Sequence, residues 1–141
     1  METTTSSIGS SKIKCIADAK SDVLLIDNDL ASYYLVFELL SDYHINVIHA
    51  RCGLEGVFLF KNNEVDLVIS ELKFPRLDGF EVLKQIREEN PEMPVWAQTA
   101  IVINSIKESC LSAGFNEFIE KPIDFKKFNH CVQQYLCSHL H

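Results

Sequence analysis

The chain has 141 residues, of which 47% are hydrophobic and 23% are charged, and its formal net charge is −7. This length suits one domain with an ordinary core, and the composition excludes a chain that is disordered throughout. The acidic balance repels phosphodiester backbones, so we expect no direct nucleic-acid partner.

Residues 1–20 are rich in serine and threonine and have no sustained hydrophobic period, which indicates a flexible leader before a domain at residues 21–141. The leader lacks the apolar core of a signal peptide, and no hydrophobic stretch is long enough to cross a bilayer. The five cysteines have no zinc-type spacing. We therefore expect a cytoplasmic protein with reduced thiols and no membrane contact.

The rest of the chain alternates between two hydrophobic patterns. Short apolar runs that end in polar residues are typical of strands buried on both faces, and stretches with a helical period separate them. This alternation predicts an α/β fold, a doubly wound five-stranded parallel sheet with flanking helices. In chain order, we expect strand 23–26, helix 34–40, strand 45–48, helix 53–60, strand 67–69, helix 80–89, strand 94–97, helix 105–113, strand 117–119 and helix 124–140.

Three residues indicate where predicted helices begin or end. The third helix stops before Pro91. Gly114 suits the C-cap of the fourth helix, and Asp124 suits the N-cap of the last one. In the second helix, one broad apolar side is formed by Leu54, Val57, Phe58 and Phe60.

Polar side chains resume where the predicted strands end. Because doubly wound sheets bind ligands at the carboxyl ends of their strands, these side chains would line one rim. Carboxylates there suit a divalent cation, and a hydroxyl and an ammonium suit the oxygens of a phosphoryl-sized anion. The strand ends read Asp27-Asn28-Asp29, Ser70-Glu71, Gln98-Thr99-Ala100 and Glu120-Lys121-Pro122.

Four segments of the chain together resemble the receiver domain of two-component response regulators. The PxxDG turn at 75–79 and the Lys121-Pro122 pair are the most specific parts of this resemblance. The resemblance implies a (βα)5 flavodoxin-like receiver fold and a role in phosphorelay signalling, with no enzyme activity beyond residual self-phosphorylation and dephosphorylation. The matching segments are 23–29, 66–83, 94–100 and 114–124.

The resemblance also gives each strand end a role. It implies a Mg²⁺ site, a phosphoryl pocket around an acceptor residue, a switch pair and a cis peptide before proline. The residues are Asp27, Asn28 and the backbone of Lys73 for the metal; Glu71, Thr99 and Lys121 for the pocket, with Glu71 at the acceptor position; Thr99 and Phe118 for the switch; and Pro122 for the cis bond.

Glu71 departs from the pattern, because the family has an aspartate at this position. The extra methylene carries the carboxylate beyond the place that in-line attack on phosphorus requires, so we expect poor phosphotransfer. The same extension brings it toward Lys121 and Thr99. There it could imitate a phosphoaspartate incompletely, with about −1 charge against nearly −2.

Two further departures weaken the expected Mg²⁺ site. Asn28 stands where the resemblance implies a second acid, and an amide oxygen brings no charge. Asp29 could compensate if the loop were shifted by one residue. Lys73 adds a positive charge beside the metal position, with its side chain pointing either into the pocket or to solvent.

The favoured hypothesis is a degenerate receiver, a pseudo-receiver that does not accept phosphate normally and acts through protein contact. One alternative is a functional Mg²⁺-dependent phospho-acceptor receiver that uses Asp27, Asp29 or Ser70. A remote alternative is a flavodoxin-like cofactor binder, which the acidic loop after the first strand disfavours.

The expected partner is a sensor kinase, a phosphotransfer protein or a downstream target. It would bind the face formed by the fourth helix, fifth strand and fifth helix, where a homodimer is also possible. The apolar stretch 100–103 and Ile106 either pack into the core or form an exposed patch there. Phe118 lacks a hydroxyl, so packing alone would set it inward or outward.

Overall fold

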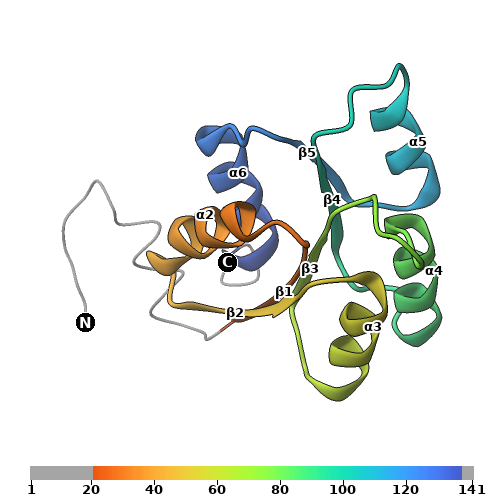
Figure 1. Ribbon diagram of the computed structural model, residues 1–141. Coiled ribbons are helices and arrows are strands. Elements are labelled where there is room, and N and C mark those ends of the chain that lie inside the picture. The colour runs from red at the N-terminus through yellow and green to blue at the C-terminus, as the bar shows by residue number, and fades with distance from the viewer. Residues whose placement is uncertain (1–20, 138–141) are drawn as a thin grey trace.

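The computed structural model describes residues 21–137 (Figure 1). The leader predicted at 1–20 and the end of the last predicted helix, at 138–140, lie outside the described residues. The elements in chain order are β1 (Ser21–Ile26), α2 (Leu30–Ser41), β2 (Ile45–Ala50), α3 (Gly53–Asn62), β3 (Leu67–Ser70), α4 (Gly79–Glu89), β4 (Val95–Thr99), α5 (Ile106–Ala113), β5 (Glu117–Glu120), α6 (Phe125–Val132) and the π-helical turn η1 (Gln133–Cys137).

All five strands are parallel, in the order β2-β1-β3-β4-β5. One hydrophobic cluster joins the sheet to α2 and α6, and the other joins it to α3, α4 and α5 on the opposite face (Figure 1). This confirms the predicted doubly wound fold with helices on both faces. None of the described helices is long and apolar enough to cross a membrane.

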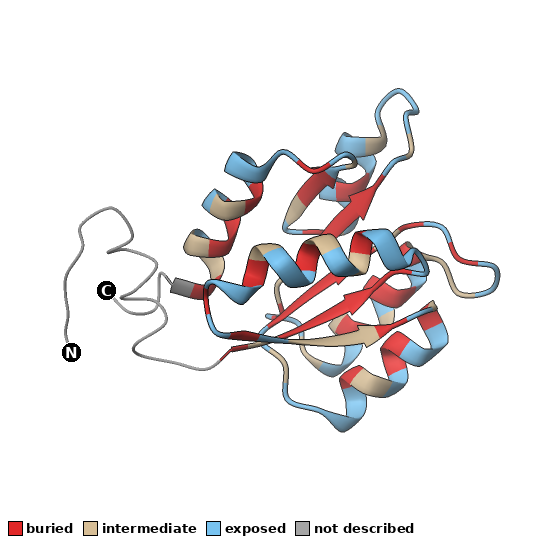
Figure 2. Ribbon diagram, turned by 60° about the vertical axis from the view of Figure 1, so that its left-hand side comes forward, coloured by how far each residue is buried: buried red, intermediate tan, exposed pale blue. Residues whose placement is uncertain are grey.

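Alternate residues of β1 supply both clusters, which explains its continuous apolar run. Val23 and Leu25 face α2 and α6, whereas Leu24 and Ile26 face the other helices. All four are fully buried, as the red central strands of Figure 2 illustrate. Such a strand loses the polar–apolar alternation of a one-sided sheet.

The helix ends follow the predicted local signals. Gly114 closes α5 with a φ of 116°, which favours glycine, and Asp124 accepts hydrogen bonds from the first amides of α6. However, α2 begins at Leu30, four residues before the predicted start. Asp29 causes this difference, because its carboxylate accepts from Ala31 N at 3.1 Å and caps the helix.

The apolar side predicted for α3 is divided. Val57 and Phe60 are buried against the sheet, whereas Leu54 and Phe58 are 50% and 63% exposed. The exposed pair lies one turn apart on the outer face of the helix. The hydrophobic pattern alone does not separate these two sides.

The strand register places the proposed site residues at one edge of the sheet. Ile26 pairs with Ser70, so Asp27 and Glu71 follow at the same level. Thr99 pairs with Glu120 and therefore lies beside Lys121. The polar residues after four strands thus meet above the carboxyl end of the sheet.

Candidate functional site

The ammonium of Lys121 lies between two carboxylates from other strands. Its Nζ donates to Asp27 Oδ2 at 2.8 Å and to Glu71 Oε1 at 3.0 Å. The side chains of Asp27, Glu71 and Lys121 are 0%, 12% and 15% exposed. This ion cluster is therefore nearly desolvated, unlike a surface salt bridge.

Asp27 is the most buried member of the cluster. Its Oδ1 accepts from Asp29 N at 2.9 Å, while Oδ2 meets Lys121. Burial raises the pKa of the Asp27 carboxyl, although the hydrogen bond from Lys121 opposes that change. Burial alone would lower the pKa of the Lys121 ammonium, but its contacts with Asp27 and Glu71 outweigh burial and raise it.

Both carboxylate oxygens of Glu71 have partners. Oε1 accepts from Lys121, and Oε2 accepts from the backbone amide of Leu72 at 2.7 Å. The expected approach of Glu71 to Lys121 is present. A hydrogen bond between Glu71 and Thr99 is absent from the described hydrogen bonds, and the Thr99 hydroxyl instead accepts from Ile101 N at 3.2 Å.

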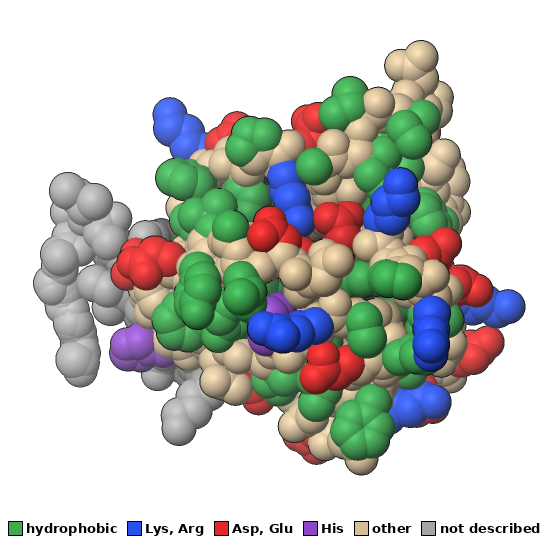
Figure 3. All heavy atoms as spheres, in the orientation of Figure 1, with side chains coloured by type: hydrophobic (Ala, Val, Ile, Leu, Met, Phe, Trp, Pro, Cys, Tyr) green, Lys and Arg blue, Asp and Glu red, His purple; other side chains and the backbone are tan. Residues whose placement is uncertain are grey.

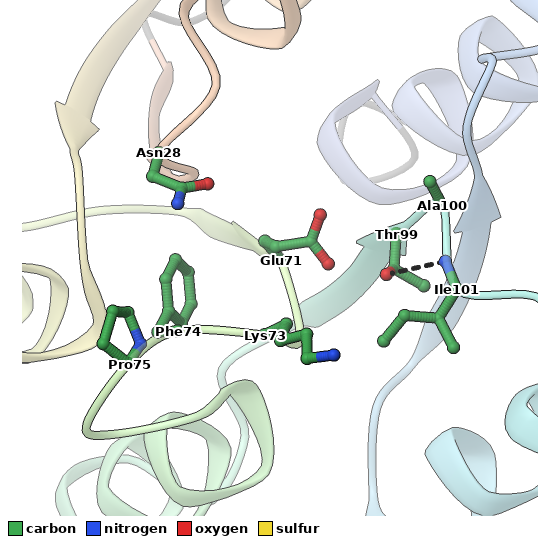
Figure 4. A pocket seen from close by; sticks show the side chains of 8 residues that line it. All are labelled: Asn28, Glu71, Lys73, Phe74, Pro75, Thr99, Ala100 and Ile101. Atoms are coloured by element: carbon green, nitrogen blue, oxygen red, sulfur yellow. Dashed lines mark hydrogen bonds between the residues drawn. The ribbon is translucent and has the colours of Figure 1, made fainter.

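A cleft of about 620 Å³ opens beside Glu71. Its polar wall combines a carboxylate, an amide, an ammonium and a hydroxyl, and its remaining wall is apolar. In Figure 4 the Lys73 side chain turns away from Pro75 toward Ile101, so its exposed ammonium lies at the cleft. The lining residues are Asn28, Glu71, Lys73, Phe74, Pro75, Thr99, Ala100 and Ile101 (Figure 4).

These residues fit a divalent cation poorly. Asn28 lines the cleft and brings no charge, and Asp27 already pairs with Lys121. Asp29 does not replace the missing acid, because it caps α2 and accepts from the Ser32 hydroxyl at 2.9 Å, which lowers the pKa of the exposed Asp29 carboxyl. Within residues 21–137, no three His, Cys, Asp or Glu side chains gather as a metal site.

Phe118 points inward. Its ring is 4% exposed and belongs to the core between the sheet and α3, α4 and α5. Phe118 and Ala97 are paired across β4 and β5, so Phe118 lies on the same face of the sheet as Thr99, two residues beyond Ala97. The two residues expected to form a switch therefore share one face, and the Lys121–Pro122 peptide bond that follows is cis, as the resemblance implied.

The apolar stretch after β4 is divided between core and surface. Ile101 and Ile106 pack partly against the core. Val102 and Ile103 are 92% and 64% exposed. Part of this stretch therefore packs into the core, and part of it is exposed at the surface.

Sequence reasoning missed two contacts around the cluster. His49 Nε2 lies 2.8 Å from the backbone oxygen of Asp27, and its ring stacks on Tyr33 at 4.3 Å. Gly79 faces the backbone of Glu71, since a Cβ there would lie 2.5 Å from the Glu71 oxygen. The PxxDG pattern carried a signal for Gly79, whereas an edge-strand histidine carries none.

Ser70 is an unsuitable substitute acceptor. Its side chain is fully buried and donates to the backbone oxygen of Glu71 at 2.8 Å. It also lies outside the cleft lining. A phosphoryl donor in the cleft would therefore not reach its hydroxyl without rearrangement of the strand.

Comparison with known proteins identifies the family from the sequence and shows the same fold in solved structures. The family model described as the response regulator receiver domain matches residues 23–133. A 14.6 kDa protein encoded in the sodA1 3′ region of Leptolyngbya boryana is 30% identical over 119 residues, which cover 83% of this chain and 91% of that protein. The transcriptional regulatory protein ZraR of Klebsiella oxytoca is 30% identical over 106 residues, which cover 75% of this chain.

The match to ZraR covers 24% of that protein, so this chain spans about a quarter of its length. Among solved structures, the chemotaxis protein CheY4 of Vibrio cholerae has a TM-score of 0.75 at 23% identity, covering 84% of this chain and 100% of that one. The receiver domain of the sensor histidine kinase PA1611 of Pseudomonas aeruginosa, solved with magnesium in its active-site cleft, has a TM-score of 0.75 at 23% identity and covers 85% of this chain and 100% of that one. The receiver domain of Ssk1 from Saccharomyces cerevisiae was solved with the phosphotransfer protein Ypd1. It has a TM-score of 0.76 at 23% identity, and the match covers 85% of this chain and 91% of that one.

Proposed function

Because this chain belongs to the response regulator receiver family of two-component signalling, we propose that it is a receiver that does not accept a phosphoryl group normally and signals through protein contact. The observation that carries this proposal is the pairing of Glu71 with Lys121 and with Leu72 N. Both oxygens of the acceptor position accept a hydrogen bond, which fixes their direction and lowers their nucleophilicity for in-line attack.

The charges of the site support the same proposal. Asp27, Asn28 and the backbone of Lys73 would hold Mg²⁺, which when bound would neutralise charge on phosphoryl oxygens. Asn28 contributes no charge, and the Lys73 ammonium adds repulsion at the cleft. Binding of Mg²⁺ by this chain should therefore be weak, whereas the magnesium in the Pseudomonas receiver is a property of that protein.

The pairing of Glu71 also favours one fixed state of the switch. A carboxylate held on Lys121 supplies part of the contact that a phosphoaspartate would make, with less charge. The inward Phe118 ring, 4% exposed, is consistent with such a fixed state. Thr99 keeps its hydrogen bond to Ile101, so the imitation lacks its hydroxyl contact.

The proposed partner is another protein of a two-component pathway: a sensor kinase, a phosphotransfer protein or a downstream target. Its binding face would comprise α5, β5 and α6, where Phe125 is exposed, together with Val102 and Ile103 of the loop before α5. A homodimer through this face is the alternative. We further propose a cytoplasmic location, no direct contact with nucleic acid and no catalytic activity beyond residual phosphorylation of itself.

Incubation with Mg²⁺ and acetyl phosphate, followed by intact-mass measurement, tests the proposal. We expect no stoichiometric phosphoryl adduct, and no change in the NMR spectrum with beryllofluoride. A clean adduct would contradict the proposal. Its position, at Glu71 or at Asp27, Asp29 or Ser70, would then identify the acceptor.

A further inference from the structure

A second, smaller pocket lies on the other side of Phe74 and Pro75 from the Glu71 cleft. It has a volume of about 250 Å³ and lies between the loop before α3 and the loop between β3 and α4. None of the roles described above uses it. Its walls include Cys52, Leu54, Phe74, Pro75, Arg76 and Leu77.

The pocket is already formed in the free chain. Gly53 lets its two loops meet, because a Cβ at this position would overlap the backbone oxygen of Leu77. Phe74 is 7% exposed and anchored in the core. Asp78 and Glu81 fix the end of the second loop with a capping box. A ligand would therefore meet ordered walls and a small ordering cost.

The surface beside the pocket is apolar. Leu54 and Phe58 lie one turn apart on the outer face of α3 and are 50% and 63% exposed. In Figure 3, green hydrophobic side chains are interspersed with blue basic and red acidic ones where α3 lies in Figure 1. Exposed apolar side chains next to a preformed pocket suit a contact with another molecule.

Basic side chains flank this apolar surface, although the whole chain carries a net charge of −7. Arg51 and Arg76 are exposed on the two loops. Neither arginine forms an ion pair with any carboxylate in the described part of the chain. Their charges are therefore available to an acidic ligand.

The carboxylates of the same loops are occupied locally. Glu55 Oε1 accepts from Arg51 N at 2.7 Å, and Asp78 accepts from Glu81 N at 3.0 Å. Glu55, Asp78 and Glu81 lie at helix N-termini, whose partial positive charge offsets the negative charge of the three carboxylates. The loops thus present arginines without an ion-pair partner, whereas each of these acids accepts a hydrogen bond from a backbone amide.

We propose that this surface binds a short acidic segment of a partner protein, which places one aromatic or aliphatic side chain in the pocket and its carboxylates beside Arg51 and Arg76. A second copy fits less well, because an isologous contact would place the same cations opposite each other. Phe74 and Pro75 line both cavities, so the bound segment touches the wall of the Glu71 cleft. The inference does not depend on whether Glu71 accepts phosphate.

The test is an NMR titration of the full chain with a synthetic peptide of glutamates around one central phenylalanine. We expect amide shifts concentrated at 52–54 and 74–77. Replacing the phenylalanine of the peptide by alanine should weaken binding about ten- to a hundredfold, as loss of one buried apolar side chain requires. Added salt should weaken it further.

Matched variants separate this surface from general effects. Arg76→Glu and Leu54→Ser should each weaken peptide binding at least about tenfold, a loss that corresponds to one charge reversal or one apolar contact. Lys107→Glu and Leu111→Ser make the same changes at exposed positions of α5 and should leave binding unchanged; Leu111 is 43% exposed, close to Leu54.

Four results would overturn the proposal. The first is the absence of shifts at 52–54 and 74–77 at millimolar peptide. The second is an equal response to a peptide with lysines in place of glutamates, which would make the site merely apolar. The third is equal weakening by the α5 variants. The last is a concentration-dependent shift of the same amides in the chain alone, which would identify a second copy as the occupant.

Discussion

The Nζ atom of Lys121 lies 2.8 Å from Oδ2 of Asp27, whose side chain has no exposed surface. An isolated charge at that depth would be costly, because protein solvates it less well than water. The ion pair therefore does more than connect β1 to the end of β5. Without Lys121, the buried Asp27 carboxylate would have no ion-pair partner, which would oppose folding.

Lys121→Met should destabilise the chain by about 3 kcal/mol, because removal of one partner leaves a buried carboxylate unpaired. Urea unfolding measures this loss. Asp27→Asn in the Lys121→Met background should recover part of the lost stability, since the remaining buried group is then neutral.

Lys107→Met is the matched control, because Lys107 is exposed and should change stability by less than about 0.5 kcal/mol. If both lysine variants cost the same, Asp27 is not held by Lys121 in the way its position indicates. Failure of Asp27→Asn to recover any stability would point to lost packing of the lysine stem instead.

The fold could be predicted from the sequence because apolar runs alternate with helical stretches along the chain. This pattern arises wherever strands are buried between two layers of helices, so each strand carries it. Val23 to Ile26 read as a strand without knowledge of its neighbours. Helix starts were harder. The start of α2 depends on the single side chain of Asp29, and the same residue had also been a candidate to replace the acid missing at Asn28.

The candidate site was predictable as a set of strand ends, since parallel strands end at one edge. The direction of each side chain was not predictable from the sequence. Glu71 pairs with Lys121, whereas Thr99 pairs with the backbone of Ile101. These partners depend on side-chain torsion angles, which the residue types do not determine. The contact of His49 with Asp27 needs the register of the β1–β2 pair.

Gly79→Ala should destabilise the chain by about 1–3 kcal/mol, the usual cost of overpacking. The new Cβ would lie 2.5 Å from the oxygen of Glu71 and 2.8 Å from Leu72 Cα, so the backbone must move. Amide shifts of Glu71 and Leu72 should accompany the loss of stability. Ser112→Ala, at an exposed position of α5, should affect neither quantity; unchanged amides at Glu71 and Leu72 would contradict this account.

Stability should fall as pH rises above 9. Burial raises the pKa of the Cys110 thiol from 9.0 to about 11, so the unfolded chain releases this proton first and gains stability relative to the folded chain. The contribution of the protonated Cys110 thiol to the unfolding free energy is therefore fully present below pH 9 and is lost by about pH 11. Burial and Glu117 raise the pKa of Tyr135 to about 12, which extends the loss to higher pH.

Cys110→Ala should therefore reduce the slope of unfolding free energy against pH between 9 and 11 by up to one proton. Urea titrations at several pH values measure this slope. Val132→Ala, also a fully buried truncation, should lower stability while the slope stays the same. An equal slope for the Cys110→Ala variant and the unaltered chain would show that this thiol does not cause the alkaline loss.

Glu71→Asp combined with Asn28→Asp should restore Mg²⁺ binding and phosphorylation by acetyl phosphate. The shorter side chain withdraws the carboxylate from Lys121, and the second acid returns the charge that a divalent cation needs. Mg²⁺ titration followed by NMR measures the first effect, and intact mass measures the second. The single variants separate the two, since Asn28→Asp should improve Mg²⁺ binding more than phosphorylation.

Lys73 supplies the remaining test of this argument, because its ammonium lies at the same cleft. Adding Lys73→Ala to the double variant should strengthen Mg²⁺ binding further, since a nearby positive charge opposes a second one. Lys107→Ala, on α5, is the control for loss of a lysine. If the double and triple variants both remain inert toward Mg²⁺ and acetyl phosphate, the replacement of these two acids does not explain the proposed loss of phosphotransfer, and the geometry of the cleft itself must differ from that of an active receiver.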